Sequence, residues 1–265
     1  MNALLIDAGN SRIKWALVRD GRVGPLQAAQ TTDSSALRDW LETAPEIGRV
    51  VASSVAGAEV EQMLGSVLRR AGAPNAEFVQ SSARAAGVSN GYRNPQQLGV
   101  DRWVGAVAAW NLAGCYRAVC AISIGTALTI DVVDHDGLHR GGLIAPSPTL
   151  MLQSLLRDTA GIAAHAAAAP PTGRRKATRR EEVLKMLATD TRQAIDLGCL
   201  STAAALIDRT VTDVTRALRG RPVVFLTGGG ADAVAPLIRS ACKQRDDLVL
   251  RGLAVLGGIP LRRGG

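Results

Sequence analysis

Apolar and polar residues near the start of the chain follow the two-residue period of β-strands. Residues 3–6 are continuously apolar, Asp7 ends this run, and after the turn AGNS every second residue from Ile13 to Leu17 is large and apolar. This pattern predicts a strand, a tight turn and a half-buried strand. The Asp20-Gly21 pair that follows is typical of a hairpin, so we expect a third, antiparallel strand.

A helical period replaces this alternation in three later segments. Between residues 57 and 72 apolar side chains recur at helical spacing, and the segment ends in two arginines and a glycine, which is typical of an amphipathic helix. Residues 99–114 and 190–218 are also helix-periodic, while residues 49–54 and 77–82 resemble strands. Strands alternating with helices favour an α/β layer architecture.

The opening pattern returns half a chain later. Residues 117–142 again give an apolar strand, a glycine turn, a second apolar strand and an Asp-Gly hairpin. Gly9 and Gly125 each precede the aspartate of their Asp-Gly pair by 11 residues, which coincidence explains poorly. The repeat predicts two duplicated α/β halves, which we assign to residues 1–114 and 115–265.

The net charge of +8 could indicate an anionic macromolecular partner, but its distribution argues against one. Five basic residues crowd into one segment after an Ala-rich and Pro-rich stretch, and aromatic residues make up only 3% of the chain. Nucleic-acid modules spread their charge along a face interleaved with stacking aromatics, so we expect a solvated basic insertion and no nucleic-acid partner. The five residues are Arg174, Arg175, Lys176, Arg179 and Arg180.

Cysteines and histidines are too scattered for a disulfide framework or a zinc site, so we expect reduced thiols. We also find no signal peptide and no apolar run of about 18 residues, so we expect a cytoplasmic protein without membrane contact. The residues concerned are Cys115, Cys120, Cys199, Cys242, His135, His139 and His165.

Three glycine-containing turns follow apolar strands, at residues 7–11, 124–129 and 227–232. Glycine lets backbone N–H groups approach an anion closely, and hydroxyl side chains in the first two turns add donors, so the turns are candidate phosphate sites. The alternative is that these glycines merely end strands. Neither the GxxxxGK[ST] nor the GxGxxG pattern is present, which argues against P-loop and Rossmann folds.

Two meander domains that each contribute a phosphate loop, with a strand-GGG-helix unit for adenosine, are typical of the actin, sugar-kinase and chaperone ATPase superfamily. We therefore expect that duplicated, actin-like α/β fold, with mixed β-sheets flanked by helices. Asp7 ends the first strand, where a magnesium ion that bridges ATP phosphates would be held, usually through water.

An acidic and a basic residue are adjacent at the start of the helix expected at residues 99–114. Asp101 is either a helix cap or a base toward a substrate hydroxyl, and Arg102 is able to bind a carboxylate or phosphate. The preceding Gly/Asn/Pro-rich loop, residues 88–98, carries Tyr92.

The order and spacing of these motifs resemble the type III pantothenate kinases, also called the Bvg accessory factor family. The resemblance implies a homodimer that phosphorylates pantothenate with ATP, the first step of coenzyme A biosynthesis. Its motifs span nearly the whole chain: DAGNSRIK, NGYRNP, GVDRW, IGTALTID, GGLIAP, DTRQAIDLG and FLTGGGAD.

The resemblance also implies roles for individual residues. Asp101 matches the proton acceptor, and Asp7 would hold magnesium through water. The ATP-binding positions are Asp7, Ala8, Gly9, Asn10, Ser11, Arg12, Ile13, Lys14, Thr126, Gly228 and Gly229. The pantothenate-binding positions are Tyr92, Gly99, Val100, Asp101, Arg102 and Thr191.

Two positions depart from the family pattern. Ser123 replaces the acid that binds a monovalent cation in many members, so potassium or ammonium dependence is in doubt, and Ser147 replaces a glycine. Two alternatives to the kinase stay open. One is another actin-like phosphotransferase or a phosphatase, which would lack NGYRNP with GVDRW; the other is a catalytically silent regulatory member, which would show decay at Asp7, Asp101 or Arg102.

Overall fold

The structure, a computed structural model, describes residues 2–158 and 187–262. The basic segment at 174–180 and His165 lie outside the described residues. Within the described part, no helix is both long and apolar enough to cross a membrane.

Residues near the N-terminus form a mixed sheet in the order β3-β2-β1-β5-β6, with β4 also paired to β2. Strand β2 is antiparallel to both β1 and β3, whereas β5 is parallel to β1 and β6 is parallel to β5. The expected meander and its Asp20-Gly21 hairpin are therefore confirmed. The strands are β1 (Ala3–Ala8), β2 (Arg12–Arg19), β3 (Arg22–Val23), β4 (Gln27–Gln30), β5 (Arg49–Ser54) and β6 (Ala76–Phe78).

The second sheet repeats this connectivity in the order β11-β10-β9-β12-β13. Its first three strands are antiparallel neighbours, and β12 and β13 continue parallel to β9. The equivalence of the two sheets confirms the duplication seen in the sequence. The strands are β9 (Val119–Ile124), β10 (Ala127–Val133), β11 (His139–Pro146), β12 (Val223–Thr227) and β13 (Cys242–Gln244).

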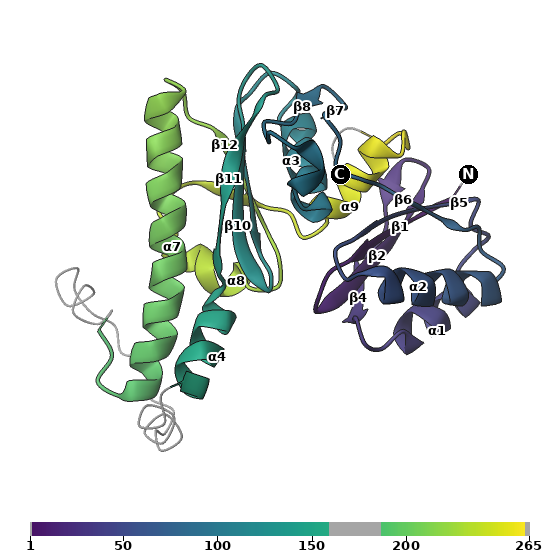
Figure 1. Ribbon diagram of the computed structural model, residues 1–265, viewed down its shortest axis with the longest axis horizontal. Helices are drawn as coiled ribbons and strands as arrows, with labels where there is room; N and C mark the ends of the chain where they lie inside the picture. The colour runs from purple at the N-terminus through teal and green to yellow at the C-terminus, as the bar shows by residue number, and fades with distance from the viewer. Residues whose placement is uncertain (1, 159–186, 263–265) are drawn as a thin grey trace.

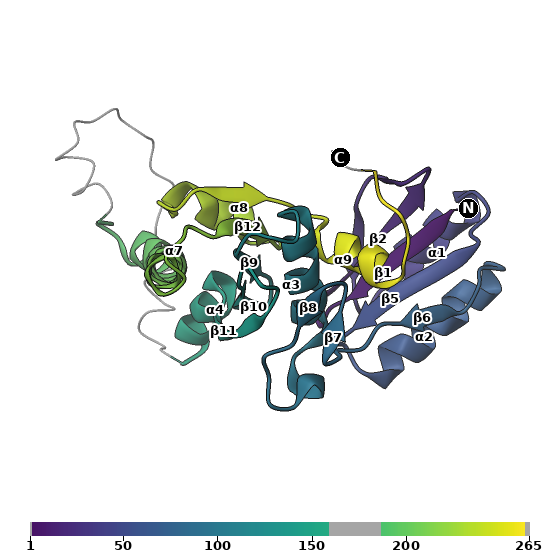
Figure 2. The same ribbon diagram turned by 90° about the horizontal axis from the view of Figure 1, so that it is seen from above.

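Helices lie on both faces of each sheet (Figures 1 and 2). In the first half, α1 (Ser35–Thr43) and α2 (Ala58–Arg70) cover one face, and in the second half α7 (Thr191–Ala217) and α8 (Ala231–Val234) do so. Between the two sheets lie α3 (Val100–Leu112) and α9 (Leu248–Leu256). The fold is thus five layers, with two helices at its centre.

The remaining short elements connect these layers. They are β7 (Arg84–Ala85), β8 (Val88–Ser89), α4 (Pro148–Asp158) and the 3-10 helices η1 (Pro95–Gln97) and η2 (Ala235–Leu237).

Strand parity decides which residues face the central helices. Along β1, Leu4 and Ile6 pack against α1 and α2, whereas Ala3 and Leu5 pack against α9. Successive strand side chains point to opposite faces, so Asp7 shares the central side with Ala3 and Leu5. On β10, Val133 packs with α3 and Ile130 packs with α7, so Asp131 lies on the side of α3. By the same rule Ser123 on β9 lies on that side too.

The structure differs from the sequence-based expectations in several places. Helix α1 and strand β4 were not anticipated, because residues 27–43 are mostly polar and lack a long periodic run. The strand expected at 77–82 ends at Phe78, and the helix after the three glycines has only four residues before Pro236 ends it. Helix α9 belongs in sequence to the second half but packs on β1. The division at residue 114 stays a prediction.

Candidate active site

The two duplicated glycine turns meet at the centre of the molecule. The Ser11 hydroxyl in the β1–β2 turn lies 2.8 Å from the Thr126 hydroxyl in the β9–β10 turn. Each turn is closed by its glycine N–H, from Gly9 to the Arg12 carbonyl at 2.9 Å and from Gly125 to the Ala127 carbonyl at 3.0 Å. The structure therefore brings together the two turns predicted to bind phosphate.

The third glycine turn lies beside the first. A side chain carbon at Gly229 would come within 3.8 Å of the Arg12 guanidinium. Gly228 has a φ of +100° and packs against the Ile124 backbone, so a residue with a Cβ would be both strained and obstructed there. All three turns thus border one region, where the positive charge of Arg12 is available to an anion.

Side chains in the segment 7–14 differ in what they can offer a ligand. Ala8 and Ile13 are buried in the core, so only their backbone groups can contribute. Asn10, Ser11 and Arg12 are exposed. Lys14 is the antiparallel partner of Asp7 across β1 and β2.

The environment of Asp7 raises the pKa of its carboxyl group. Burial raises the pKa of its carboxyl from 3.8 to about 6, and the negative charge of Asp101 adds to this rise. The Ser53 hydroxyl, which donates to Asp7 Oδ1 at 2.9 Å, and the charge of Lys14 oppose it. A cation beside Asp7 would offset the desolvation cost of its ionised carboxylate, which suits a residue expected to hold magnesium.

Asp101 lies in the first turn of α3, above the bare backbone of Gly99. A side chain carbon at Gly99 would be 2.8 Å from Asp101 Oδ1, so a larger residue there would displace the carboxylate. Burial raises the pKa of Asp101, and the backbone N–H and the charge of Arg102 oppose this. A carboxylate in the first turn of a helix favours the helix N-terminus, while the raised pKa fits a general base, so the position of Asp101 accommodates both interpretations.

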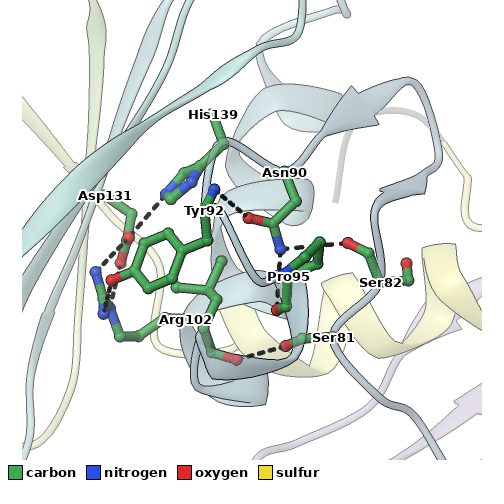
Figure 3. Close-up of polar contacts among 9 residues, drawn as sticks. Ser81, Ser82, Asn90, Tyr92, Pro95, Arg102, Asp131 and His139 are labelled. Carbon is green, nitrogen blue, oxygen red and sulfur yellow. Dashed lines mark hydrogen bonds and ion pairs between the residues drawn. The ribbon is translucent and has the colours of Figure 1, made fainter.

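The expected pantothenate residues Tyr92 and Arg102 are in contact with each other (Figure 3). Arg102 Nη1 donates to the Tyr92 hydroxyl at 2.9 Å. Its Nε and Nη2 donate to Asp131, a residue that sequence analysis had given no role. Gly99 and Val100 begin the same helix.

Thr191 is not brought to this group. It is the first residue of α7, whose N-terminal part packs through Ile195 and Cys199 against α4. Figures 1 and 2 show α4 and this end of α7 on the far side of the second sheet from α3. Within one chain, Thr191 therefore does not complete the set around Arg102.

Ser123 occupies the position in the second sheet that Asp7 occupies in the first. Each is the penultimate residue of its strand. Asp7 lies between Lys14 and Ser53 on the neighbouring strands, and Ser123 lies between Thr129 and Thr227 in the same way. The alignment of these two residues across the duplication is confirmed. Ser147, the second departure from the family pattern, immediately precedes α4, and its hydroxyl accepts a hydrogen bond from the Leu150 N–H at 3.3 Å.

Among the described residues no group of three or more His, Cys, Asp or Glu side chains could hold a metal ion. A divalent ion at Asp7 would therefore take most of its ligands from phosphate oxygens and water. The four cysteines, all described, are free thiols.

Sequence analysis missed Ser53, Asp131 and His139 as parts of the site. Asp131 carried a signal, because a charge inside the apolar run of β10 needs a buried partner. Ser53 and His139 carried none beyond their strand positions.

The family model for type III pantothenate kinase matches residues 3–213. Curated relatives of that name include one from Nitrosococcus oceani, 35% identical and covering 95% of this chain and 92% of its own, and one from Xanthomonas campestris pv. campestris, 39% identical with 96% coverage of both.

Solved structures share the fold at low sequence identity. An activator of 2-hydroxyisocaproyl-CoA dehydratase from Clostridium difficile with bound ADPNP aligns with a TM-score of 0.52 at 14% identity, covering 98% of this chain and 96% of that one. A putative 2-dehydro-3-deoxygalactonokinase from Sinorhizobium meliloti aligns with a TM-score of 0.53 at 15% identity, covering 96% and 98%. The expected actin-like fold is confirmed, and the chain belongs to the type III pantothenate kinase family.

Proposed function

We propose that this protein transfers the γ-phosphoryl group of ATP to the primary hydroxyl of pantothenate, giving 4'-phosphopantothenate in the first step of coenzyme A biosynthesis. The observation that carries the proposal is the meeting of the turns at Ser11 and Thr126 close to Asp7 and Asp101. Phosphoryl transfer depends on positioning and on neutralising charge more than on covalent help, and this arrangement supplies both.

In this reaction Asp101 is the general base. Its raised pKa makes it a stronger proton acceptor than an ordinary aspartate, and its place at the start of α3 fixes its direction. Asp7 would hold magnesium through water, which would neutralise phosphate charge, and the N–H groups of the three glycine turns would bind phosphate oxygens. The ATP-binding residues are those of segment 7–14 together with Thr126, Gly228 and Gly229.

Pantothenate binds on the side of Tyr92, Gly99, Val100 and Arg102. Its carboxylate accepts from the guanidinium and the tyrosine hydroxyl, which leaves its primary hydroxyl toward Asp101. Arg102 has five N–H donors and three are directed to Asp131 and Tyr92, so donors remain for a ligand.

The functional form is a homodimer in the cytoplasm. Two observations support the dimer: Thr191 lies away from the other substrate residues, and the neighbouring surface of β11 and α4 exposes Leu143, Ile144 and Leu150. Ile144 is 65% exposed, and such apolar surfaces commonly mark interfaces. A second copy would cover them and bring its own Thr191 to the site.

ADP release by the purified protein tests the function directly. ATP and magnesium are mixed with pantothenate, with a panel of other small alcohols, with polyphosphate, or with no acceptor. We expect pantothenate-dependent ADP release and a product with the mass of the phosphate monoester. Release with another acceptor would indicate a different phosphotransferase, phosphate release from polyphosphate would indicate a phosphatase, and no turnover would indicate a regulatory protein.

A further inference from the structure

Arg102 and Asp131 form a buried, two-pronged ion pair that joins the two halves of the molecule. Arg102 Nε lies 2.9 Å from Asp131 Oδ2, and Nη2 lies 2.7 Å from Oδ1 (Figure 3). The side chains are only 6% and 2% exposed. Arg102 belongs to α3, whereas Asp131 belongs to β10 of the second sheet. The pair therefore fixes the guanidinium plane, because two parallel hydrogen bonds allow one orientation.

His139 extends this pair toward Tyr92. Its Nε2 lies 2.9 Å from Asp131 Oδ1, and its ring centroid lies 5.8 Å from that of Tyr92. His139 is completely buried on β11, the strand next to β10. The Tyr92 hydroxyl returns to Arg102 Nη1. Asp131 thus touches Arg102 directly and touches Tyr92 through the His139 ring.

Two glycines leave space for this group. A side chain carbon at Gly142 would collide with the Ile130 backbone carbonyl and would lie 2.5 Å from Asp131 Oδ1 and 2.6 Å from Arg102 Nη2, and one at Gly91 would collide with the His139 backbone. Neither glycine has a left-handed φ, so the space, and not the backbone conformation, requires the missing side chain. The loop that carries Tyr92 and the β10–β11 hairpin are therefore shaped to fit each other.

The contribution of this buried ion pair to folding stability does not explain why Arg102 and Asp131 are paired. Desolvation of two charges offsets most of their attraction, and an apolar pair of similar volume is often as stable. The pair is also neutral overall, so a substrate carboxylate would be recognised through the direction of N–H and O–H donors more than through net charge. Directional recognition depends on residues that lock the donors in place.

Resting on the proposed function, we propose that Asp131, assisted by His139, is a positioning residue that holds the Arg102 guanidinium and the Tyr92 hydroxyl for the carboxylate of pantothenate. The role goes beyond support of the fold, because it predicts a selective loss of carboxylate recognition. ATP, which binds at the glycine turns, would be unaffected.

The test compares Asp131→Asn with Asp134→Asn. Asp134 is a matched control: it is buried in the same hairpin and paired with Arg140 at 2.8 Å, but its contacts do not include Arg102 or Tyr92. Each protein is assayed with pantothenate and with the alcohol analogue in which CH2OH replaces the carboxylate. Melting temperature and the KM for ATP are measured alongside.

We expect Asp131→Asn to raise the KM for pantothenate by about 10-fold or more with the KM for ATP unchanged, because the Arg102 guanidinium is no longer oriented by two charge-assisted hydrogen bonds. Its preference for pantothenate over the alcohol, as a ratio of kcat/KM, should fall by a similar factor. Asp134→Asn should lower the melting temperature and leave that ratio at the wild-type value.

His139→Phe provides a second, independent variant that keeps an aromatic ring against Tyr92 and removes the bond to Asp131. It should lower the same ratio in the same direction, by a smaller factor, and it decides the question if Asp131→Asn does not fold. Wild-type turnover with an unchanged ratio in the folded variants would overturn the positioning role alone. A wild-type protein that does not phosphorylate pantothenate would overturn the proposed function itself.

Discussion

The hydroxyls of Ser11 and Thr126 lie 2.8 Å apart, although 115 positions separate them in the chain. Each occupies the tight turn between the first two strands of its sheet. The contact therefore joins equivalent points of the duplicated halves, at the place where ATP phosphates are proposed to bind.

Removing these hydroxyls tests that assignment. We expect Ser11→Ala and Thr126→Ala each to raise the KM for ATP by about 3- to 30-fold, because each loses one hydrogen bond to a charged phosphate. The KM for pantothenate should change little. Thr32→Ala, at an exposed hydroxyl beyond β4, is the control. If both variants keep the wild-type KM for ATP, the phosphates bind elsewhere.

Replacing Asp101 by Asn keeps the size of the side chain and removes the base. We expect kcat to fall by roughly 10²- to 10⁴-fold while ATP binding changes little. Stopped-flow or steady-state ADP release measures the rate, and ATP titration measures the binding. Activity within a few-fold of the wild type would reduce Asp101 to a helix cap.

Asp7 links activity and stability to pH in opposite directions. Its pKa is about 6 in the folded protein against 3.8 ordinarily, so the folded state holds this proton more tightly than the unfolded state does. The free energy of unfolding therefore falls as pH rises from 3.8 to about 6, and the loss persists above that range. Turnover should show the reverse trend, because the ionised form is needed beside magnesium.

Asp7→Asn should consequently be inactive yet more stable at pH 8, by about 1 to 3 kcal/mol, with the difference vanishing below pH 4. Urea unfolding at both pH values measures it. Asp33→Asn is the control with the opposite sign, since backbone and side-chain hydrogen bonds from Ser35 lower the pKa of Asp33. An Asp7→Asn variant less stable than the wild type at pH 8 would contradict the assigned burial.

The residue at position 123 leads to a prediction about activation of turnover by potassium. A neutral hydroxyl binds potassium less well than the carboxylate it replaces, since hard cations favour charged oxygens. We expect weak activation by potassium over sodium, and stronger activation in Ser123→Asp. Initial rates against potassium concentration at fixed ionic strength measure this, with choline as the inert control. Strong, saturable activation of the wild type at low millimolar potassium would show that other ligands build the site.

The proposed dimer predicts that Ile144→Glu dissociates the protein and reduces its turnover, because a charge would replace an apolar contact of β11. Light scattering at micromolar concentration measures the mass. Tyr116→Glu, at a residue 70% exposed after α3, is the control and should remain dimeric. A fully active wild-type monomer would refute a shared site.

Local sequence pattern was sufficient to predict most of the fold and the positions of the three glycine turns. Strand and helix periods, glycine turns and the repeated spacing of Gly9 and Gly125 depend on neighbours a few residues apart, and they identified the meanders, the duplication and helices α2, α3 and α7. The same short-range information placed Asp7 and Asp101 at the ends of their elements.

Only the tertiary structure decided which side chains meet across the halves. The sequence shows an aspartate inside β10 and an arginine at the start of α3, but strand parity gives a face and not a partner, so Asp131 and Arg102 remained unconnected. The tertiary structure also places Thr191 away from Tyr92 and packs α9 against the first sheet. These outcomes depend on how whole layers pack, because contacts between residues far apart in the chain are fixed by the packing of complete elements.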